Sequence, residues 1–185
     1  MKNKEEYIMR TLKMIKTIIF VLLGIFLLVC SKVALEYLPY TIGFIMTLYA
    51  VFKIVGGIIK HNLFKDEHAL FEGLILLLFA FVMMFMVKDN FVTVCIIWGT
   101  WSILREAAEL TEDFERLMQK GPGLLSIIES IIVIVLSVSM IAHPTEHHAH
   151  IHIYLLGIEL LLEVILPQLY GVWYMKHPKP VEEHE

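Results

Sequence analysis

The densest group of chemically versatile side chains lies in the last fifty residues of the sequence. Five of the nine histidines and one glutamate fall within ten residues of each other. They are His143, Glu146, His147, His148, His150 and His152. Alternate residues face one way in an extended chain, and residues four apart share a face in a helix, so either conformation gathers two or three imidazoles. Imidazole nitrogens with a carboxylate oxygen are typical ligands of a zinc-like divalent ion.

The same histidine segment could instead respond to acid. Imidazoles titrate at about pH 6.5, so external acidification would add several positive charges to this one segment. The sequence offers no cysteine or second ligand cluster beside it that would complete a closed metal site. Three interpretations therefore stay open, namely an incidental hydrophilic loop, a proton-responsive element and a site for a zinc-like ion.

A second candidate site is a pair of glutamates inside an apolar run. Glu159 and Glu163 lie one helical turn apart and on one face, where two carboxylates repel each other unless one is protonated or a cation lies between them. If their helix begins near Ile151, Glu159 lies about 12 Å along it, close to the middle of a bilayer. Lys53 is the cation expected at the most similar depth. The pair predicts either a proton-binding or ion-binding site or, as the favoured interpretation, a structural ion pair with Lys53.

Other charged residues are expected near the inner ends of the apolar runs. A charge inside an apolar span costs several kcal/mol unless it is paired or hydrated. Lys53 and Arg105 could therefore pair with Glu72, Glu129 and Glu163 in a belt that holds the helices together. Four further acidic residues are expected to form a solvated cytoplasmic face: Glu106, Glu109, Asp113 and Glu115.

These residues must be positioned by membrane helices. Of the 185 residues, 58% are hydrophobic and 18% are charged, which is more apolar surface than one soluble domain of this length can bury. The sequence predicts an all-α polytopic bundle of six transmembrane helices. The six apolar runs cover residues 15–35, 41–59, 69–87, 91–104, 124–142 and 151–173. The fourth run continues as a polar helix that ends at the glycine and proline of residues 121–123, and residues 143–150 are expected to form an outer loop.

The basic residues predict the orientation of the bundle. Most of them lie in four places that must share one side of the membrane: before the first run, after the last run, between the second and third runs, and between the fourth and fifth runs. The connections on the opposite side have only Lys32 and Lys88. The inner residues are Lys2, Lys4, Arg10, Lys13, Lys16, Lys60, Lys65, Arg116, Lys120, Lys176 and Lys179. Cytoplasmic loops carry the excess of positive charge, so both termini are expected inside. The chain then divides into a cytoplasmic segment 1–14, a transmembrane domain 15–173 and a cytoplasmic tail 174–185.

The six runs can be grouped into three helical hairpins. Each hairpin enters from the cytoplasm and turns at the outer side, at Pro39, at residues 88–90 and at Pro144. This regularity predicts a triplicated hairpin. With glycine-bearing apolar runs at residues 19–28 and 51–59, the chain resembles the HdeD-like family of small bacterial membrane proteins, which are built from short repeats of unknown function. The middle hairpin departs from the pattern because Asn90 stands where a proline is expected.

The resemblance implies a location in the bacterial inner membrane and a role in acid or stress resistance, and it carries over no catalytic residue. We therefore expect a non-enzymatic membrane protein of acid, stress or envelope homeostasis. The alternative is a small transporter or channel for protons, metal ions or a small solute. No phosphate loop, nucleophile elbow or basic aromatic patch is present, so no nucleic acid is expected. The expected partners are the lipid bilayer and a second copy of the chain, with no cofactor beyond a zinc-like ion at the histidine segment.

Overall fold

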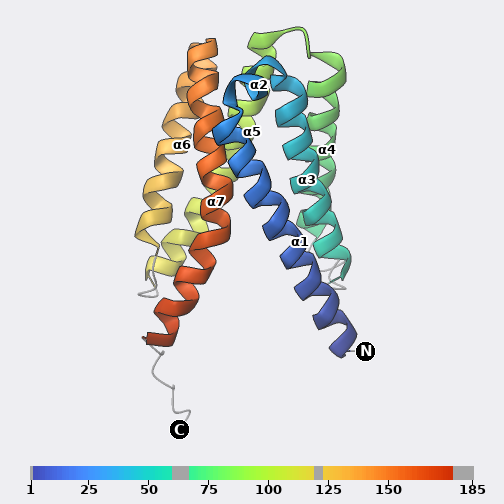
Figure 1. The fold of residues 1–185 in the computed structure, drawn as a ribbon, viewed down its shortest axis with the longest axis vertical. Helices are drawn as coiled ribbons and strands as arrows, with labels where there is room; N and C mark the ends of the chain where they lie inside the picture. Colours follow the sequence, from blue (N-terminus) through green and yellow to red (C-terminus); the bar gives the residue numbers. More distant parts are fainter. Residues whose placement is uncertain (1, 60–66, 119–122, 177–185) are drawn as a thin grey trace.

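The computed structural model describes residues 2–59, 67–118 and 123–176, and every regular element in these ranges is a helix. The elements are α1 (Lys2–Val29), α2 (Ser31–Glu36), α3 (Leu38–Ile59), α4 (Glu67–Phe81), the π-helix η1 (Val82–Met86), α5 (Phe91–Met118), α6 (Leu124–Ala142) and α7 (Glu146–Lys176) (Figure 1). The predicted all-α class is confirmed. Of the basic residues used to predict orientation, Lys60, Lys65, Lys120 and Lys179 lie outside the described residues.

Five helices are long and apolar enough to cross a membrane. The qualifying stretches are Arg10–Val29, Leu38–Ile58, Phe91–Met118, Leu124–Ala142 and Glu146–Tyr170. The third predicted run forms a shorter apolar helix, Leu70–Met86, in which α4 passes into η1. Large apolar side chains such as Leu22, Leu78 and Val135 point outward and are more than half exposed, as they are on a surface that faces lipid. The fold is consistent with a membrane protein.

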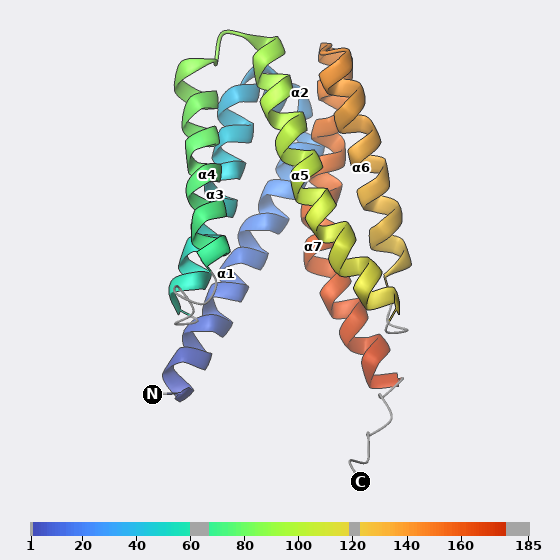
Figure 2. The same ribbon diagram turned by 180° about the vertical axis from the view of Figure 1, so that it is seen from behind.

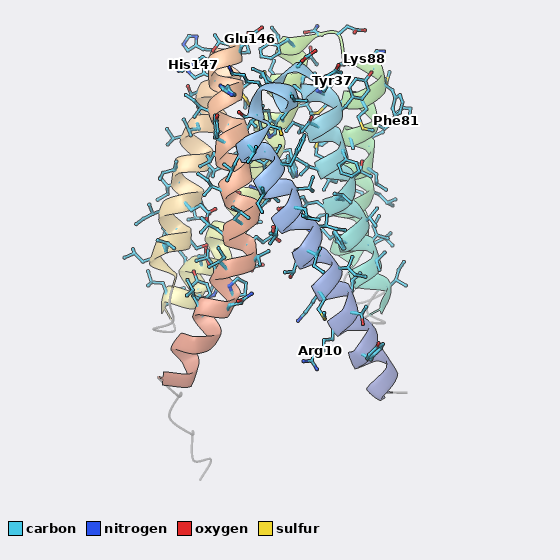
Figure 3. All side chains as sticks on the ribbon, in the orientation of Figure 1. Arg10, Tyr37, Phe81, Lys88, Glu146 and His147 are labelled. Atoms are coloured by element: carbon cyan, nitrogen blue, oxygen red, sulfur yellow. The ribbon has the colours of Figure 1, made fainter. Side chains whose placement is uncertain are left out.

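The helices run between two ends of the bundle. The start of α1 and the end of α7 lie at one end, here called the terminal end (Figure 1). The connections between α1 and α3, between η1 and α5, and between α6 and α7 lie at the opposite end, here called the turn end. Figure 3 shows Tyr37, Lys88, Glu146 and His147 at the turn end and Arg10 near the terminal end. The residues that the sequence assigns to opposite sides of the membrane are therefore separated along the long axis.

The most extensive helix contacts join helices of different predicted hairpins. α3 packs along α4, α5 along α6, and α1 along α7, whereas α4 and α5 make little contact with each other in the described ranges. Glycines permit the close approach: a Cβ at Gly24 of α1 would lie 2.9 Å from the carbonyl oxygen of Gly157 of α7, and one at Gly99 of α5 would lie 3.1 Å from that of Ser137 of α6. Viewed from behind, α5 crosses from the α4 side at the turn end to the α6 side at the terminal end (Figure 2).

The helices differ from the predicted apolar runs in three places. The helix of the first run already begins at Lys2, inside the segment 1–14, and it is interrupted at Cys30, where the backbone leaves helical geometry before α2. The expected outer loop at residues 143–150 is largely helical, because α7 begins at Glu146 and includes all but the first of the five clustered histidines. Thr145 explains this early start, since its side-chain oxygen accepts a hydrogen bond from the backbone N–H of His148 at 3.3 Å, as an N-cap residue does.

Candidate functional site

The guanidinium of Arg105 on α5 lies at the centre of a buried charged cluster. Its Nη2 donates to Oε1 of Glu106 at 2.5 Å and also to Oε2 of Glu159 on α7. A third carboxylate, that of Glu109 one turn further along α5, lies 3.9 Å from Nε. The Arg105 side chain is 12% exposed, and those of Glu106 and Glu159 are 3% and 6% exposed. One cation therefore holds two carboxylates in the interior of the bundle.

Aromatic rings cover the rest of the guanidinium. The Cζ atom of Arg105 lies 5.2 Å from the ring centre of Trp101 and 5.6 Å from that of Tyr49 on α3. The two rings contact each other edge to face at 5.7 Å. A cation over an aromatic face gains electrostatic energy that is larger when water is excluded. These rings position the guanidinium towards the carboxylates of α7.

A second pair of contacts extends the cluster to α1 and α3. Glu163 on α7 accepts a hydrogen bond from Nζ of Lys16 on α1 at 2.5 Å through one oxygen. Its other oxygen accepts one from Oη of Tyr49 at 2.6 Å. Lys16 also lies over the ring of Phe20, with its Nζ 4.9 Å from the ring centre. Glu159 and Glu163 are thus held by two different cations from two different helices.

The cluster encloses a cavity of about 50 Å³, enough for a few water molecules. Its lining residues are Tyr49, Arg105, Glu106, Glu109, Ser126, Glu129, Glu159, Glu163 and Leu166. Five carboxylates thus surround the cavity with Arg105 as the lining cation and Lys16 at its edge. Two buried atoms of one ion pair, Nη1 of Arg105 and Oε1 of Glu159, have no hydrogen-bond partner. The residues that line the cavity therefore offer a hydrogen-bond donor and an acceptor that have no partner among the described residues, next to several carboxylates.

The predicted pairing of Lys53 with Glu159 or Glu163 is wrong. Lys53 of α3 forms an ion pair with Glu72 of α4. Both side chains are about half exposed, at 49% and 52%, and neither lines the cavity. The reason is that α3 packs along α4, while α7 meets α5 and α1 at this level. A belt of ion pairs is present, and Lys53–Glu72 is one of the pairs expected in it, whereas Arg105 pairs with Glu106 and Glu159.

Sequence reasoning missed the role of Tyr49 and Lys16 and misplaced two acidic residues. Glu106 and Asp113 were expected on a solvated face, yet they are 2% and 3% exposed. The sequence does contain a signal for the burial of these two residues. Cys95, Trp98 and Ser102 follow the helical spacing of one buried face of α5, and the same spacing continues to Glu106 and Asp113. Asp113 is held by Arg116 one turn away.

The clustered histidines do not converge. His148 bonds through Nδ1 to the carbonyl oxygen of His143 at 2.8 Å, and His147 is exposed beside it. Nε2 of His150 lies 3.1 Å from Oγ of Ser31 on α2, and His152 is buried against Ser137 on α6. Within the part of the chain that the structure describes, no three histidine, cysteine or acidic side chains lie close enough together to hold a metal ion.

Fold and site together define an all-helical bundle of the membrane-spanning kind, with a buried ionic cluster around Arg105 in its interior. The family described as "short repeat of unknown function" (DUF308) matches the chain twice, at residues 15–85 and 71–142. The chain belongs to this family. No curated protein and no solved structure matches it. The matched residues contain Arg105 and Tyr49 but not α7, so Glu159 and Glu163 come from a helix outside the repeats.

Proposed function

We propose that this chain is a non-enzymatic, proton-responsive membrane protein whose buried cluster around Arg105 takes up protons when the surroundings become acidic. The observation that carries the proposal is the cavity, where five carboxylates meet one lining arginine. Carboxylates in excess over cations around a small cavity repel one another, and protonation of one of them relieves the repulsion. Buried ionisable groups inside a bundle of membrane helices are more often functional than structural.

The arrangement of the cluster explains how proton uptake could change the bundle. Glu159 and Glu163 tie α7 to α5 through Arg105 and to α1 through Lys16. Protonation of either glutamate weakens one of these ties, because a neutral carboxylic acid no longer attracts the cation. The proton-responsive element of this proposal is therefore the inner cluster, whereas the sequence had offered the histidine segment as one possible proton-responsive element.

The proposed setting is the bacterial inner membrane, with both termini in the cytoplasm and six spans. Five of the spans are the long apolar helices, and α4 with η1 forms the remaining, shorter one, which is third along the chain. The separation of the two ends of the bundle along its long axis supports this topology, because Arg10 of the predicted inner side lies near the terminal end and Lys88 of the predicted outer side lies at the turn end (Figure 3). Two matches to one short repeat support an origin from repeated hairpins. A role in acid or stress resistance, as in the HdeD-like proteins that the chain resembles, fits proton uptake.

The test is the acid response of the purified protein in lipid nanodiscs. Trp101 lies against Arg105, so tryptophan fluorescence should change when the pH falls from about 7.5 to about 5. Glu159→Gln should suppress this change, since it replaces the buried carboxylate by a neutral group of the same shape. Glu146→Gln, which alters an exposed carboxylate at the turn end, is the matched control and should leave the response intact. An equal response in wild-type protein and Glu159→Gln would contradict the proposal.

The alternative is a small transporter or channel for protons or another small solute. The open donor on Arg105 and open acceptor on Glu159 favour it, because both line a cavity. Flux of protons or of any small solute into vesicles that contain the protein separates this alternative from a purely conformational response.

A further inference from the structure

A second buried titratable group lies in the turn half of α7, away from the cavity. His152 is 1% exposed and packs its ring against that of Trp98 on α5, with ring centres 4.7 Å apart. Its Nε2 lies 2.8 Å from Oγ of Ser137 on α6, which is itself fully buried. The ring is therefore fixed by two helices and takes no part in the cluster around Arg105.

The hydrogen bonds define which nitrogen of His152 carries a proton. The hydroxyl of Ser137 donates its hydrogen to the carbonyl oxygen of Val133 at 2.7 Å, because that oxygen can only accept. The Ser137 oxygen must then accept a hydrogen bond from the Nε2–H of His152. In the neutral ring this leaves Nδ1 as an unprotonated acceptor, and Nδ1 is buried with no hydrogen-bond partner among the residues that the structure describes. His152 thus holds one open position for a proton.

His152 and the glutamates of the cluster share one face of α7. His152 and Glu159 are seven residues apart, which is almost two full turns, and Glu163 follows one turn later. The distance between the first two along the helix is about 10 Å at 1.5 Å per residue. Leu156, 1% exposed, lies between them on this face of α7, whereas Gly157, where α7 approaches Gly24 of α1, lies on the other side of the helix. A buried leucine therefore separates two buried titratable groups.

We propose that His152 is the outer proton-binding site of a proton path along α7, with Glu159 as the inner site and the buried Leu156 as the barrier between them. This proposal rests on the proposed function of the cluster and extends it from proton uptake to proton transfer across the bundle. In the transfer, Nδ1 of His152 gains a proton from the turn end and becomes an imidazolium. When water enters beside Leu156, that proton passes to the carboxylate of Glu159, which leaves a neutral imidazole and a carboxylic acid.

The groups around His152 suit a side chain that holds a proton only briefly. α6 presents Ser137 and α5 presents Trp98, with the thiol of Cys95 one turn earlier on the same face of α5. On α7 itself, the neighbouring His150 bonds Ser31 of α2. Arg105, seven residues after Trp98 on α5, is the cation of the neighbouring cluster. Since a lasting charge in a dry span is costly, the proton must move on to a carboxylate.

The test is proton flux into reconstituted vesicles that contain an entrapped pH dye, under an imposed pH gradient. Wild-type protein should carry protons, and His152→Gln should reduce the rate about a hundredfold, the lower end of what a positioned proton-transfer group contributes. Glu159→Gln should reduce it similarly. His147→Gln, an exposed histidine on the first turn of α7, is the matched control and should retain the wild-type rate.

The outcomes distinguish this path from the proposed function. If His152→Gln loses flux but keeps the acid response of tryptophan fluorescence, both proposals are supported. If wild-type protein carries no protons, or His152→Gln carries them at the wild-type rate, the path is refuted while the acid response of the cluster can still stand.

A measurement on the unaltered protein covers the case in which His152→Gln does not fold. Nitrogen NMR of ¹⁵N-histidine-labelled protein in lipid should show His152 with a protonated Nε2 and an unprotonated Nδ1 at neutral pH. Ser137→Ala, which removes the acceptor of that Nε2–H, should remove this preference. A ring protonated at Nδ1 in the wild-type protein would overturn the proposal.

Discussion

Replacement of Arg105 by glutamine should be one of the most destabilising single changes in the bundle. The side chain is 12% exposed and its guanidinium is bonded to two carboxylates that are themselves nearly fully buried. Loss of one partner of a buried ion pair costs about 3–5 kcal/mol, because the remaining charge is left uncompensated. In Arg105→Gln the uncompensated groups are Glu106 and Glu159, so we expect a loss in the free energy of unfolding near the upper end of that range.

A double variant tests the physical reason for this loss. In Arg105→Gln/Glu159→Gln one of the two uncompensated carboxylates becomes a neutral amide, so about 1–3 kcal/mol of the stability should return. The assay is reversible unfolding in mixed micelles, followed by far-ultraviolet circular dichroism. Arg10→Gln, which removes an exposed arginine of α1, is the control and should change the free energy of unfolding by less than about 0.5 kcal/mol. The reasoning is refuted if Arg105→Gln costs no more than Arg10→Gln, or if the double variant is less stable than Arg105→Gln.

Three further predictions use the same unfolding assay. Glu106→Gln should lower the free energy of unfolding by about 1–3 kcal/mol, whereas the exposed Glu115→Gln should change it by less than about 0.5 kcal/mol, and equal losses would contradict the burial of Glu106. Gly24→Ala should cost about 1–3 kcal/mol because its Cβ would lie 2.9 Å from a backbone oxygen of α7, while Gly56→Ala, with no neighbour within 4 Å, should cost nothing measurable. Lys53→Gln should cost less than about 1 kcal/mol, since its ion pair is half exposed, and a loss as large as that of Arg105→Gln would place Lys53 in the cluster after all.

The positions of the helices could be predicted well from the sequence because apolar runs and helix boundaries leave local signals. The fifth predicted run agrees with α6, Leu124–Ala142, and the fourth begins with α5 at Phe91. The start of α7 was missed because four histidines made the segment look like a hydrophilic loop. The local signal was nevertheless present, since Pro144, Thr145 and Glu146 form a typical helix start.

The partners within the cluster could not be predicted in the same way. Hydropathy gives the depth of a charged residue along its helix but not which helices are neighbours. Lys53 was expected at the depth of Glu159 and Arg105 nearer the inner interface, yet the packing of α7 against α5 and α1 brings Arg105 and Lys16 to the two glutamates. Tyr49 left no signal of its own, because a tyrosine in an apolar run is ordinary until Glu163 is found within hydrogen-bond distance.

The pairing of α1 with α7 determines the order in which the bundle can be completed during synthesis. α1 is made before α7, along which it packs, and Lys16 finds its carboxylate only when Glu163 has been made. Until then α1 must be tolerated in the membrane with its lysine near the interface and with Gly24 facing lipid or another protein. A chain that stops before α7 would retain Lys16 without its carboxylate and Arg105 without Glu159, which would make it a target for membrane quality control.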